Sequence, residues 1–411
     1  MLQQNTDHIQ TTHIGSLPRP HDLLDLMKAK FTGQPYDQRT YDQTIARAVR
    51  DVVKKQAECG IDVVTDGEFS KPGFFTYIRQ RLDGFEARPN QKLLLFETEV
   101  AAFPEYYAQY FKEAMMGGTV VPIVPVVCTG PVKYQGEALL KTDIDNVKAA
   151  AKAAGVPEGR VFLPATAPSG VGINEYYKTE EEYFHALASE LNKEYRAIVG
   201  AGLLVQIDDP FLPDIFVDPR LDGQQKKRRA EIYVEAANAA LKGVPSEKVR
   251  FHTCYGINEG PRIHEAALAD IIRYVLKIKA TQYSFECANP RHEHEYHLFE
   301  DIKVPDGKVL CPGVITHASN IVEHPELIAE RLLRFAKLVG RENVMAGADC
   351  GFSSQALYKT EVHPTVVWEK FKAMRQGAEL ATKQLWAKRP RPKAKGQRTR
   401  KAAARTARRR K

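Results

Sequence analysis

The sequence predicts an α/β protein built as a TIM-type (β/α)8 barrel. Apolar, β-branched runs alternate with helical patterns at intervals of roughly 30 to 45 residues, the rhythm of parallel βα units. The runs end in Gly, Pro or Asn beside His, Cys and acidic residues, which is typical of the functional end of such folds. A doubly wound open sheet is the second choice, because no Gly-x-Gly-x-x-Gly follows the first run and no Gly-rich phosphate loop with Gly-Lys-Ser/Thr occurs.

The predicted strands number nine, one more than an eight-stranded barrel holds. They are residues 8–16, 61–69, 120–128, 160–168, 203–210, 248–256, 281–288, 308–317 and 343–351. We assign 120–128 to an accessory position, because it follows an aromatic-rich segment (70–118) that does not look like a plain crossover and is expected to be an insertion after the second strand. Amphipathic runs at 179–202 and 324–340 end in Gly and predict helices.

The charge divides the chain into a mildly acidic body and a basic tail. The net charge is +8, but residues 388–411 hold 13 Lys and Arg and no acid, which leaves 46 basic and 51 acidic residues in the body. Without large apolar residues this segment cannot bury a core, so we expect a barrel domain over 1–385 and a disordered tail over 386–411. The tail would make weak, salt-sensitive contacts with nucleic acid or another polyanion. The alternative is a solvated, dispensable terminus.

Cysteine usage and hydropathy indicate a reducing, cytoplasmic setting. The cysteines lack the spacing of a small disulfide-rich domain, and the N-terminus has no apolar signal-peptide core. No stretch approaches the roughly 20 apolar residues of a membrane span, so we expect no membrane partner. Thiols would stay available as metal ligands. The oligomeric state is left open.

Four strand-end residues supply the donors of a zinc site: His252, Cys254, Glu286 and Cys350. His252 and Cys254 are two apart, so their side chains face the same way and can hold one ion, with Glu286 and Cys350 coming from other strands. The alternative is that each Cys is a small buried hydrophobe and the His a satisfied polar group. If the strand were shifted by one residue, Cys287 would replace Glu286.

Other polar residues allow structural interpretations beside functional ones. Glu68 and Asp208 are strand-end acids that could bind a cation or form structural salt bridges. Asp209 precedes Pro210 and could cap a helix. The run from His292 to His297 could suggest a second metal site, but at the start of an acidic helix His294 and His297 are expected to form a solvated face.

Seven landmarks resemble those of the C-terminal catalytic domain of cobalamin-independent methionine synthase, and they occur in the same order. They are Ile14-Gly15-Ser16, Asp66-Gly67-Glu68-Phe69, Gln206-Ile207-Asp208-Asp209-Pro210, His252-Thr253-Cys254, Glu286, Pro312-Gly313-Val314 with His317, and Asp349-Cys350-Gly351. The likeness spans residues 9 to about 380. It implies one zinc bound by His252, Cys254, Glu286 and Cys350, where an incoming thiol displaces one ligand and is held as a thiolate for methyl transfer.

The resemblance also implies where the substrates bind. The amino-acid end of homocysteine would lie against the backbone of Ile14, Gly15 and Ser16, with Glu68 and Asp208 facing its ammonium group. His317 falls at the position of a proton donor, and Asp214 matches an acidic folate contact. The methyl donor is less defined, since the chain has a single barrel and residues 172–178 contain no folate-stacking Trp. It is expected to be of the methyltetrahydrofolate or the corrinoid type.

Three alternative functions follow from the same residues. Epoxyalkane:coenzyme M transferases are single-barrel relatives that use the same zinc-thiolate step, but a sulfonate thiol would favour Arg where Glu68 and Asp208 stand. A zinc-storing barrel would not need those two acids. A nucleic-acid-associated protein acting through its tail is disfavoured as the main function by the acidic body.

Overall fold

The centre of the molecule is a curled parallel sheet whose strands follow one another in chain order. The computed structural model describes residues 4–5, 7–91, 95–115, 118–256 and 259–387. Six strands pair in the order β3-β5-β6-β7-β8-β9, all in parallel. They are β3 (Phe162–Thr166), β5 (Leu204–Asp208), β6 (Val249–His252), β7 (Gln282–Phe285), β8 (Val309–Ile315) and β9 (Gly347–Ala348). A doubly wound sheet would reverse its order at a switch point, so the doubly wound alternative is wrong.

Isolated parallel bridges continue the pairing beyond both edges of this sheet. Val64 bridges to Val161 beside β3, Thr12 bridges to Val63, and Thr11 bridges to Ala346 beside β9. The predicted strands 8–16 and 61–69 are therefore reduced to two bridged residues each, Thr11 and Thr12 in the first and Val63 and Val64 in the second. The result is an α/β fold with a curled parallel sheet, consistent with a TIM-type barrel.

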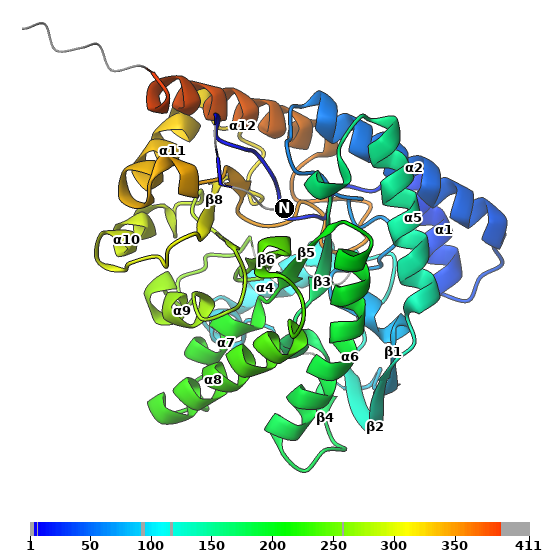
Figure 1. Cartoon of the computed structure of the whole chain (residues 1–411). Coiled ribbons are helices and arrows are strands. Elements are labelled where there is room, and N and C mark those ends of the chain that lie inside the picture. Colours follow the sequence, from blue (N-terminus) through cyan, green and yellow to red (C-terminus); the bar gives the residue numbers. More distant parts are fainter. Residues whose placement is uncertain (1–3, 6, 92–94, 116–117, 257–258, 388–411) are drawn as a thin grey trace, which may run out of the picture.

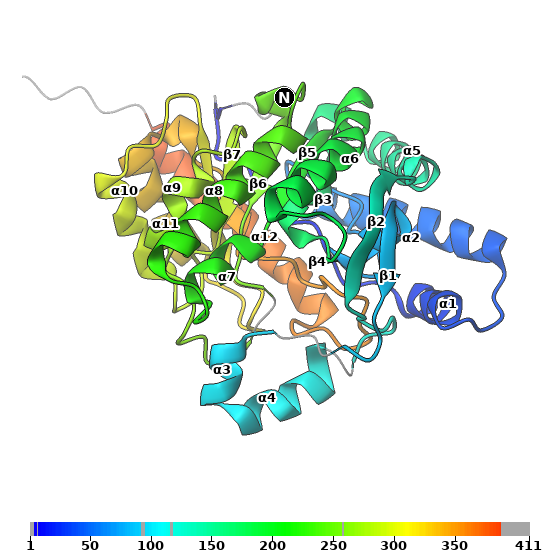
Figure 2. The same cartoon turned by 90° about the horizontal axis from the view of Figure 1, so that it is seen from below.

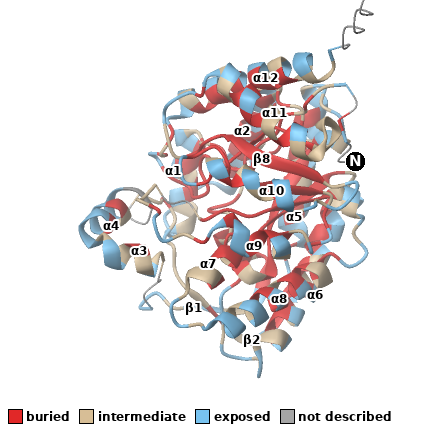
Figure 3. Cartoon of the chain, turned by 90° about the vertical axis from the view of Figure 1, so that its left-hand side faces the viewer, coloured by how far each residue is buried: buried red, intermediate tan, exposed pale blue. Residues whose placement is uncertain are grey.

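Helices surround the sheet (Figure 1) and turn their exposed faces outward, while the strands are buried (Figure 3). Strands covered in this way are apolar along their whole length, and every residue of β5 and β8 is buried. The surrounding helices are α1 (His21–Phe31), α2 (Gln38–Glu58), α5 (Glu137–Ala153), α6 (Glu180–Gly200), α7 (Phe211–Val217), α8 (Gly223–Ala240), α9 (Leu268–Val275), α10 (Leu298–Asp301), α11 (Pro325–Val339) and α12 (Pro364–Leu385).

The helices predicted at 179–202 and 324–340 are confirmed as α6 and α11. Thr179 accepts a hydrogen bond from the backbone N–H of Glu182 at 3.1 Å, which caps the start of α6. α11 begins at Pro325, whose missing N–H costs nothing at that position. It ends before Gly340, which has φ of 90° and so takes a conformation that suits glycine.

A smaller sheet lies outside the parallel one. In it β1 (Leu82–Ala87) pairs antiparallel with β2 (Val126–Tyr134), and β2 pairs parallel with β4 (Ile173–Asn174). The strand predicted at 120–128 overlaps β2 only from Val126 and continues to Tyr134. Pro122 and Pro125 lack the N–H that a ladder needs, which explains the later start.

Two short helices, α3 (Glu97–Ala102) and α4 (Pro104–Tyr110), stand apart from the others (Figure 2). Tyr107 and Tyr110 form a small core of their own with partly buried neighbours such as Phe96 and Phe103. α3 and α4 fall within the segment that the sequence marked as an insertion.

The chain's last described helix, α12, ends at Leu385, and the basic segment 388–411 lies outside the described residues. Among the helices that the structure describes, none combines the length and the apolar character that crossing a membrane requires.

Candidate metal centre and substrate pocket

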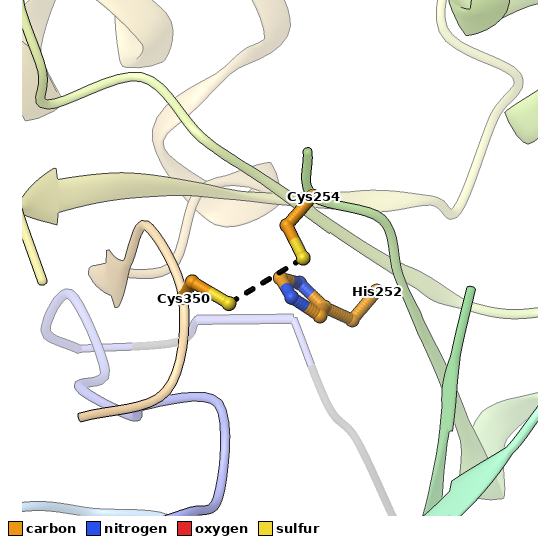
Figure 4. Close-up of side chains that lie close together, drawn as sticks. All are labelled: His252, Cys254 and Cys350. Carbon is orange, nitrogen blue, oxygen red and sulfur yellow. Dashed lines mark hydrogen bonds between the residues drawn. The ribbon is translucent and has the colours of Figure 1, made fainter. Parts of the chain in front are cut away.

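Three of the four predicted metal ligands meet at the carboxyl end of the parallel strands. His252 is the last residue of β6, Cys254 follows two residues later, and Cys350 comes after β9. One potential ligand atom from each lies within 4.8 Å of the others. The sulfurs of Cys254 and Cys350 are 3.4 Å apart, and the ring of His252 lies beside them (Figure 4).

The chemistry of this trio fits a soft divalent cation such as zinc. Both ring nitrogens of His252 are buried and have no hydrogen-bond partner in the described part of the chain. Burial, and then the charge of Arg250, lower the pKa of His252 to about 3, so the ring is neutral and able to ligate. The hydrogen bond with Cys350, together with burial, raises the pKa of the Cys254 thiol well above its usual value. A bound cation would reverse that effect, because it stabilises the thiolate.

Glu286, the fourth predicted ligand, lies in a neighbouring group with His317 and Asp349. Its Oε2 accepts hydrogen bonds from Nη2 of Arg262 and Nδ2 of Asn289, both at 2.8 Å. Its Oε1 accepts a longer bond from the backbone N–H of Tyr255 at 3.3 Å. The carboxylate is therefore held by protein donors in this arrangement.

Cys287 points away from the trio. Its sulfur lies 3.6 Å from the carbonyl oxygen of His292 and belongs to neither group of candidate ligands among the described residues. The structure thus has the register in which Glu286, and not Cys287, faces the site.

His317, the predicted proton donor, follows β8 and is buried with both ring nitrogens unpartnered among the described residues. Burial, and then the charge of Arg262, lower its pKa to about 4. The ring is therefore uncharged at neutral pH in this arrangement and would have to gain a proton before it could act as an acid. Asp349 lies beside it and accepts from the backbone N–H groups of Cys287 and Ala288, both at 2.7 Å.

A pocket next to the trio collects most of the predicted substrate residues. His252, Cys254 and Cys350 line it together with Ile14, Ser16, Glu68 and Asp208. The soft donors and the two acids therefore open onto the same space. The cavity has a volume of about 20 Å³, so a ligand larger than a water would have to widen it. Such a ligand would meet the soft donors at one end and the two acids at the other.

Glu68 and Asp208 are a buried pair of acids with one lysine nearby. Burial, and then the charge of Glu68, raise the pKa of Asp208 well above its usual value, and burial also raises that of Glu68. Oε2 of Glu68 has no hydrogen-bond partner among the described residues, and Nζ of Lys71 lies 3.8 Å from it. Burial and mutual repulsion both disfavour the ionised forms of the two acids, so an ammonium group beside them would stabilise those forms.

Gly15 brings the backbone against Glu68. Its φ is 139°, and a Cβ atom there would lie 2.6 Å from Cγ of Pro164 and 2.9 Å from Oε1 of Glu68. Only glycine allows this approach. The next residue, Ser16, places its hydroxyl 3.2 Å from that of Ser354.

Asp214 lies away from this pocket, in α7. It lines a separate cavity with Tyr255, His264 and Glu265. Asp214 is exposed to the cavity but surrounded by protein atoms, and this desolvation, and then the charge of Asp209, raise its pKa to about 7. Asp209 itself accepts from the backbone N–H groups of Phe211 and Leu212, both at 3.1 Å, so its interpretation as a helix cap is confirmed.

Several residues around the site were not predicted from the sequence. Lys71 could have been found, since a buried acid such as Glu68 needs a partner and the residue three positions on is a lysine. Arg262 lies in a loop without periodic pattern and carries no local signal. His294 and His297 are exposed, as expected, whereas His292 is buried between Glu265 and Glu295, at 3.1 and 2.7 Å. The ring of Tyr255 stacks on His292, with ring centroids 4.1 Å apart, and helps to bury it.

A family model and several curated proteins are similar to this chain. The family model described as "Cobalamin-independent synthase, Catalytic domain" matches residues 9–156 and 172–378. The methionine synthase of Sulfolobus acidocaldarius is 26% identical over 347 residues, which cover 84% of this chain and 85% of that protein. The 5-methyltetrahydropteroyltriglutamate–homocysteine methyltransferase of Thermotoga petrophila is 24% identical over 84% of this chain, but only 41% of its own length is matched.

A solved structure shows the same fold. The B12-independent methionine synthase from Shewanella sp. W3-18-1, in complex with selenomethionine, superposes with a TM-score of 0.70 at 20% sequence identity. The match covers 93% of this chain and 100% of that one.

Proposed function

The chain belongs to the family of cobalamin-independent methionine synthase catalytic domains, and from this premise we propose that it transfers a methyl group to a homocysteine-like thiol, forming methionine or a related thioether. The observation that carries the proposal is the shared pocket, in which three soft donors and two buried acids face one space. Such a pocket suits a small molecule with a thiol at one end and an ammonium group at the other.

Zinc is the metal that the donors suit best. His252, Cys254 and Cys350 would hold it, with Glu286 as the fourth ligand when no thiol is bound. The unpartnered nitrogens of His252 and the adjacent sulfurs support this assignment. Zinc would lower the pKa of the substrate thiol from its usual value of about 8.5 and so supply the nucleophilic thiolate at neutral pH.

The protein's own groups orient the thiol substrate. Glu68 and Asp208 would bind its ammonium group, whose charge would stabilise the two buried carboxylates. The backbone of Ile14, Gly15 and Ser16 would contact its carboxylate end. Orientation of this kind brings the thiol to the metal donors in a reactive geometry.

The methyl donor would bind on the side of His317 and Asp214. An amine such as that of a methyltetrahydrofolate leaves poorly as an anion, so a proton must reach its nitrogen. His317 would pass this proton on after taking one up itself, with the adjacent Asp349 stabilising the imidazolium. Asp214, with its raised pKa, would contact the donor from the adjacent cavity. A corrinoid donor would not need this proton.

The finer description of the fold is also a proposal. We interpret the sheet and its bridges as a closed (β/α)8 barrel within a domain of residues 1–385, with residues 70–118 as an insertion after the second strand. Residues 386–411 would be a separate basic tail with weak polyanion contacts.

A two-substrate assay tests the function. Zinc-loaded protein is incubated with homocysteine or coenzyme M, each with a methyltetrahydrofolate or methylcobalamin, and the methylated thiol is measured by mass spectrometry. Methionine should form with at least one donor. Glu68→Gln and Asp208→Asn should each reduce kcat/KM for homocysteine by about 100-fold, the equivalent of about 3 kcal/mol for a lost charged contact. The exposed acid Glu300 provides the control Glu300→Gln, with no change expected.

Two results would overturn the proposal. Turnover of coenzyme M without turnover of homocysteine would favour an alkyltransferase for sulfonate thiols. Zinc binding without turnover of either thiol, with every donor, would favour metal storage.

A further inference from the structure

We propose that Arg262 forms an ion pair with the carboxylate of Glu286 when an incoming thiol replaces that carboxylate at the metal. This role makes Arg262 a positioning residue for thiol binding. The inference rests on the proposed function, because it concerns the same metal centre. It starts from the observation that Glu286 is held by Arg262 instead of joining His252, Cys254 and Cys350.

The pairing of Glu286 with Arg262 is close and fully buried. Nη2 of Arg262 lies 2.8 Å from Oε2 of Glu286, and the two residues are 4% and 1% exposed. Nδ2 of Asn289 donates to the same oxygen at 2.8 Å. Charge-assisted bonds of this kind are about twice as strong as neutral ones. Arg262 and Asn289 therefore give the Glu286 carboxylate protein partners in place of a metal ion.

Contacts other than the one with Glu286 also hold Arg262 in position. Its Nε donates to Oε1 of Glu265 at 2.5 Å, and its guanidinium lies 5.8 Å from the ring of Tyr255. Its φ is 58°, in the left-handed region that a side chain of this size rarely adopts. Such a backbone persists only where the surrounding contacts hold it.

The surrounding contacts come from α3 and α4. Oη of Tyr106 donates to the carbonyl oxygen of Glu259 at 2.9 Å, and the backbone N–H of His264 donates to Oε1 of Glu99 at 2.6 Å. These bonds hold the loop on both sides of Arg262. The guanidinium of Arg262 is thus held by the fold at the position where it pairs with Glu286.

This geometry changes the energetics of thiol binding. A thiol that takes the place of Glu286 leaves that carboxylate buried, and an unpaired buried charge is costly. Arg262 and Asn289 remove that cost, because they pair with the carboxylate where the structure places it. Arg262 should therefore favour thiol binding and disfavour the Glu286–metal bond.

Two binding constants on zinc-loaded protein test this prediction without an activity assay. Zinc affinity is measured by competition with a chelator, and homocysteine affinity by calorimetry. Arg262→Gln should weaken homocysteine binding by about 10- to 100-fold, the range of one charged hydrogen bond. The same variant should bind zinc more tightly, because Glu286 then has only the metal as a charged partner.

A double variant and two single variants make the test specific. Adding Glu286→Gln to Arg262→Gln should restore homocysteine affinity to that of Glu286→Gln alone, since no carboxylate remains to be received. Arg262→Lys keeps the charge but cannot bond Glu265 and Glu286 through one planar fork, so it should weaken homocysteine binding several-fold. Arg334→Gln is the control, because Arg334 pairs with Glu293 at 3.3 Å away from the pocket.

The outcomes separate a positioning role from a structural one. If Arg262→Gln weakened zinc and homocysteine binding together and Glu286→Gln did not rescue it, the inference would be overturned. If Arg262→Gln failed to fold, unchanged homocysteine affinity in Arg262→Lys would overturn it as well. Failure of the wild-type protein to bind zinc or homocysteine would instead refute the proposed function.

Discussion

At the scale of single residues, the site is marked by buried polar atoms that the protein itself leaves unpaired. His252 and His317 each have both ring nitrogens unpartnered among the described residues, and Oε2 of Glu68 lacks a hydrogen bond. Buried polar groups are almost always paired in folded proteins, so such exceptions call for an explanation. All three belong to the proposed metal, proton-donor and ammonium positions, where a ligand would satisfy them.

The two cysteines of the trio should determine the metal content. Purified protein is expected to carry about one zinc per chain, and Cys254→Ser or Cys350→Ser should lose it, because a hydroxyl is a poor zinc ligand. Elemental analysis measures this directly. Cys311→Ser is the matched control, since Cys311 is equally buried but lies within β8 away from the trio. Undiminished zinc in both ligand variants would contradict the assignment.

His292 should make the protein's stability depend on pH in the alkaline range. Burial lowers its pKa, but hydrogen bonds to Glu265 and Glu295, and then the charge of Glu286, outweigh this and raise it to about 9. A pKa raised above the unfolded value of about 6.5 gives stabilisation that is complete below pH ~6.5 and is lost as the pH rises through ~9.

The measurement is the free energy of unfolding of the zinc-loaded wild type and of His292→Gln in urea. The variant should be less stable by about 3 kcal/mol at pH 6, and the difference should shrink towards pH 9.5. His297→Gln is the control, because His297 pairs with Glu300 on the surface, where such pairs contribute about 0–1 kcal/mol. A difference that does not change with pH would show that His292 is not protonated in the folded protein.

At the scale of elements, the short helices α3 and α4 support the loop that carries Arg262. They have their own small aromatic core, and they reach the loop through Glu99 and Tyr106. Segments with few contacts to the main core open locally at low free energy. Through this loop and Arg262, the two peripheral helices therefore influence where the Glu286 carboxylate lies.

Removal of the Glu99 contact should loosen this loop. In Glu99→Ala the backbone N–H of His264 loses its acceptor, so hydrogen exchange in residues 259–266 should be faster than in the wild type. Homocysteine affinity should fall several-fold, because Arg262 is held less firmly. Glu97→Ala in the same helix is the control, since Glu97 pairs only with Arg220 near the surface at 3.3 Å among the described contacts. Equal exchange in both variants would exclude a supporting role for Glu99.

At the scale of the whole molecule, charge and chemistry are separated along the chain. The proposed ligands and acids all precede residue 352, whereas 13 of the 59 basic residues lie in segment 388–411. The sequence of that segment offers no large apolar side chain to dock it on the body. Catalysis and polyanion contact should therefore be separable.

Deletion of residues 388–411 should leave folding, zinc content and methyl transfer unchanged and abolish binding to DNA or RNA. Binding by the full chain, followed by fluorescence anisotropy with a labelled oligonucleotide, should weaken steeply as salt rises from about 50 to about 200 mM, because phosphate contacts act by counterion release. A truncated protein that kept its zinc but lost its rate at saturating substrate would show that the tail reaches the active site.

Local sequence determined the elements that bear the site. Apolar β-branched runs predicted β3, β5, β6, β7 and β8 close to their observed bounds, and cap residues such as Thr179 and Gly340 marked the ends of α6 and α11. These features could be predicted because they depend on backbone propensity, side-chain periodicity and caps, which act between neighbouring residues. The same patterns placed His252, Cys254, Glu286 and Cys350 at strand ends. In a parallel sheet the carboxyl ends of the strands lie together, so these residues come to the same end of the sheet.

Only the tertiary structure decided which of these groups pair with each other. Cys254 and Cys350 lie in contact although they are 96 positions apart in the sequence. Glu286, which also lies at a strand end, pairs instead with Arg262, which lies in a loop 24 positions away. Likewise His292 is buried by Glu265 and Tyr255, which no helical pattern around it could indicate. A buried charge binds whichever opposite charge the fold brings closest, and that choice depends on competition in a region of low dielectric between groups that are remote in sequence.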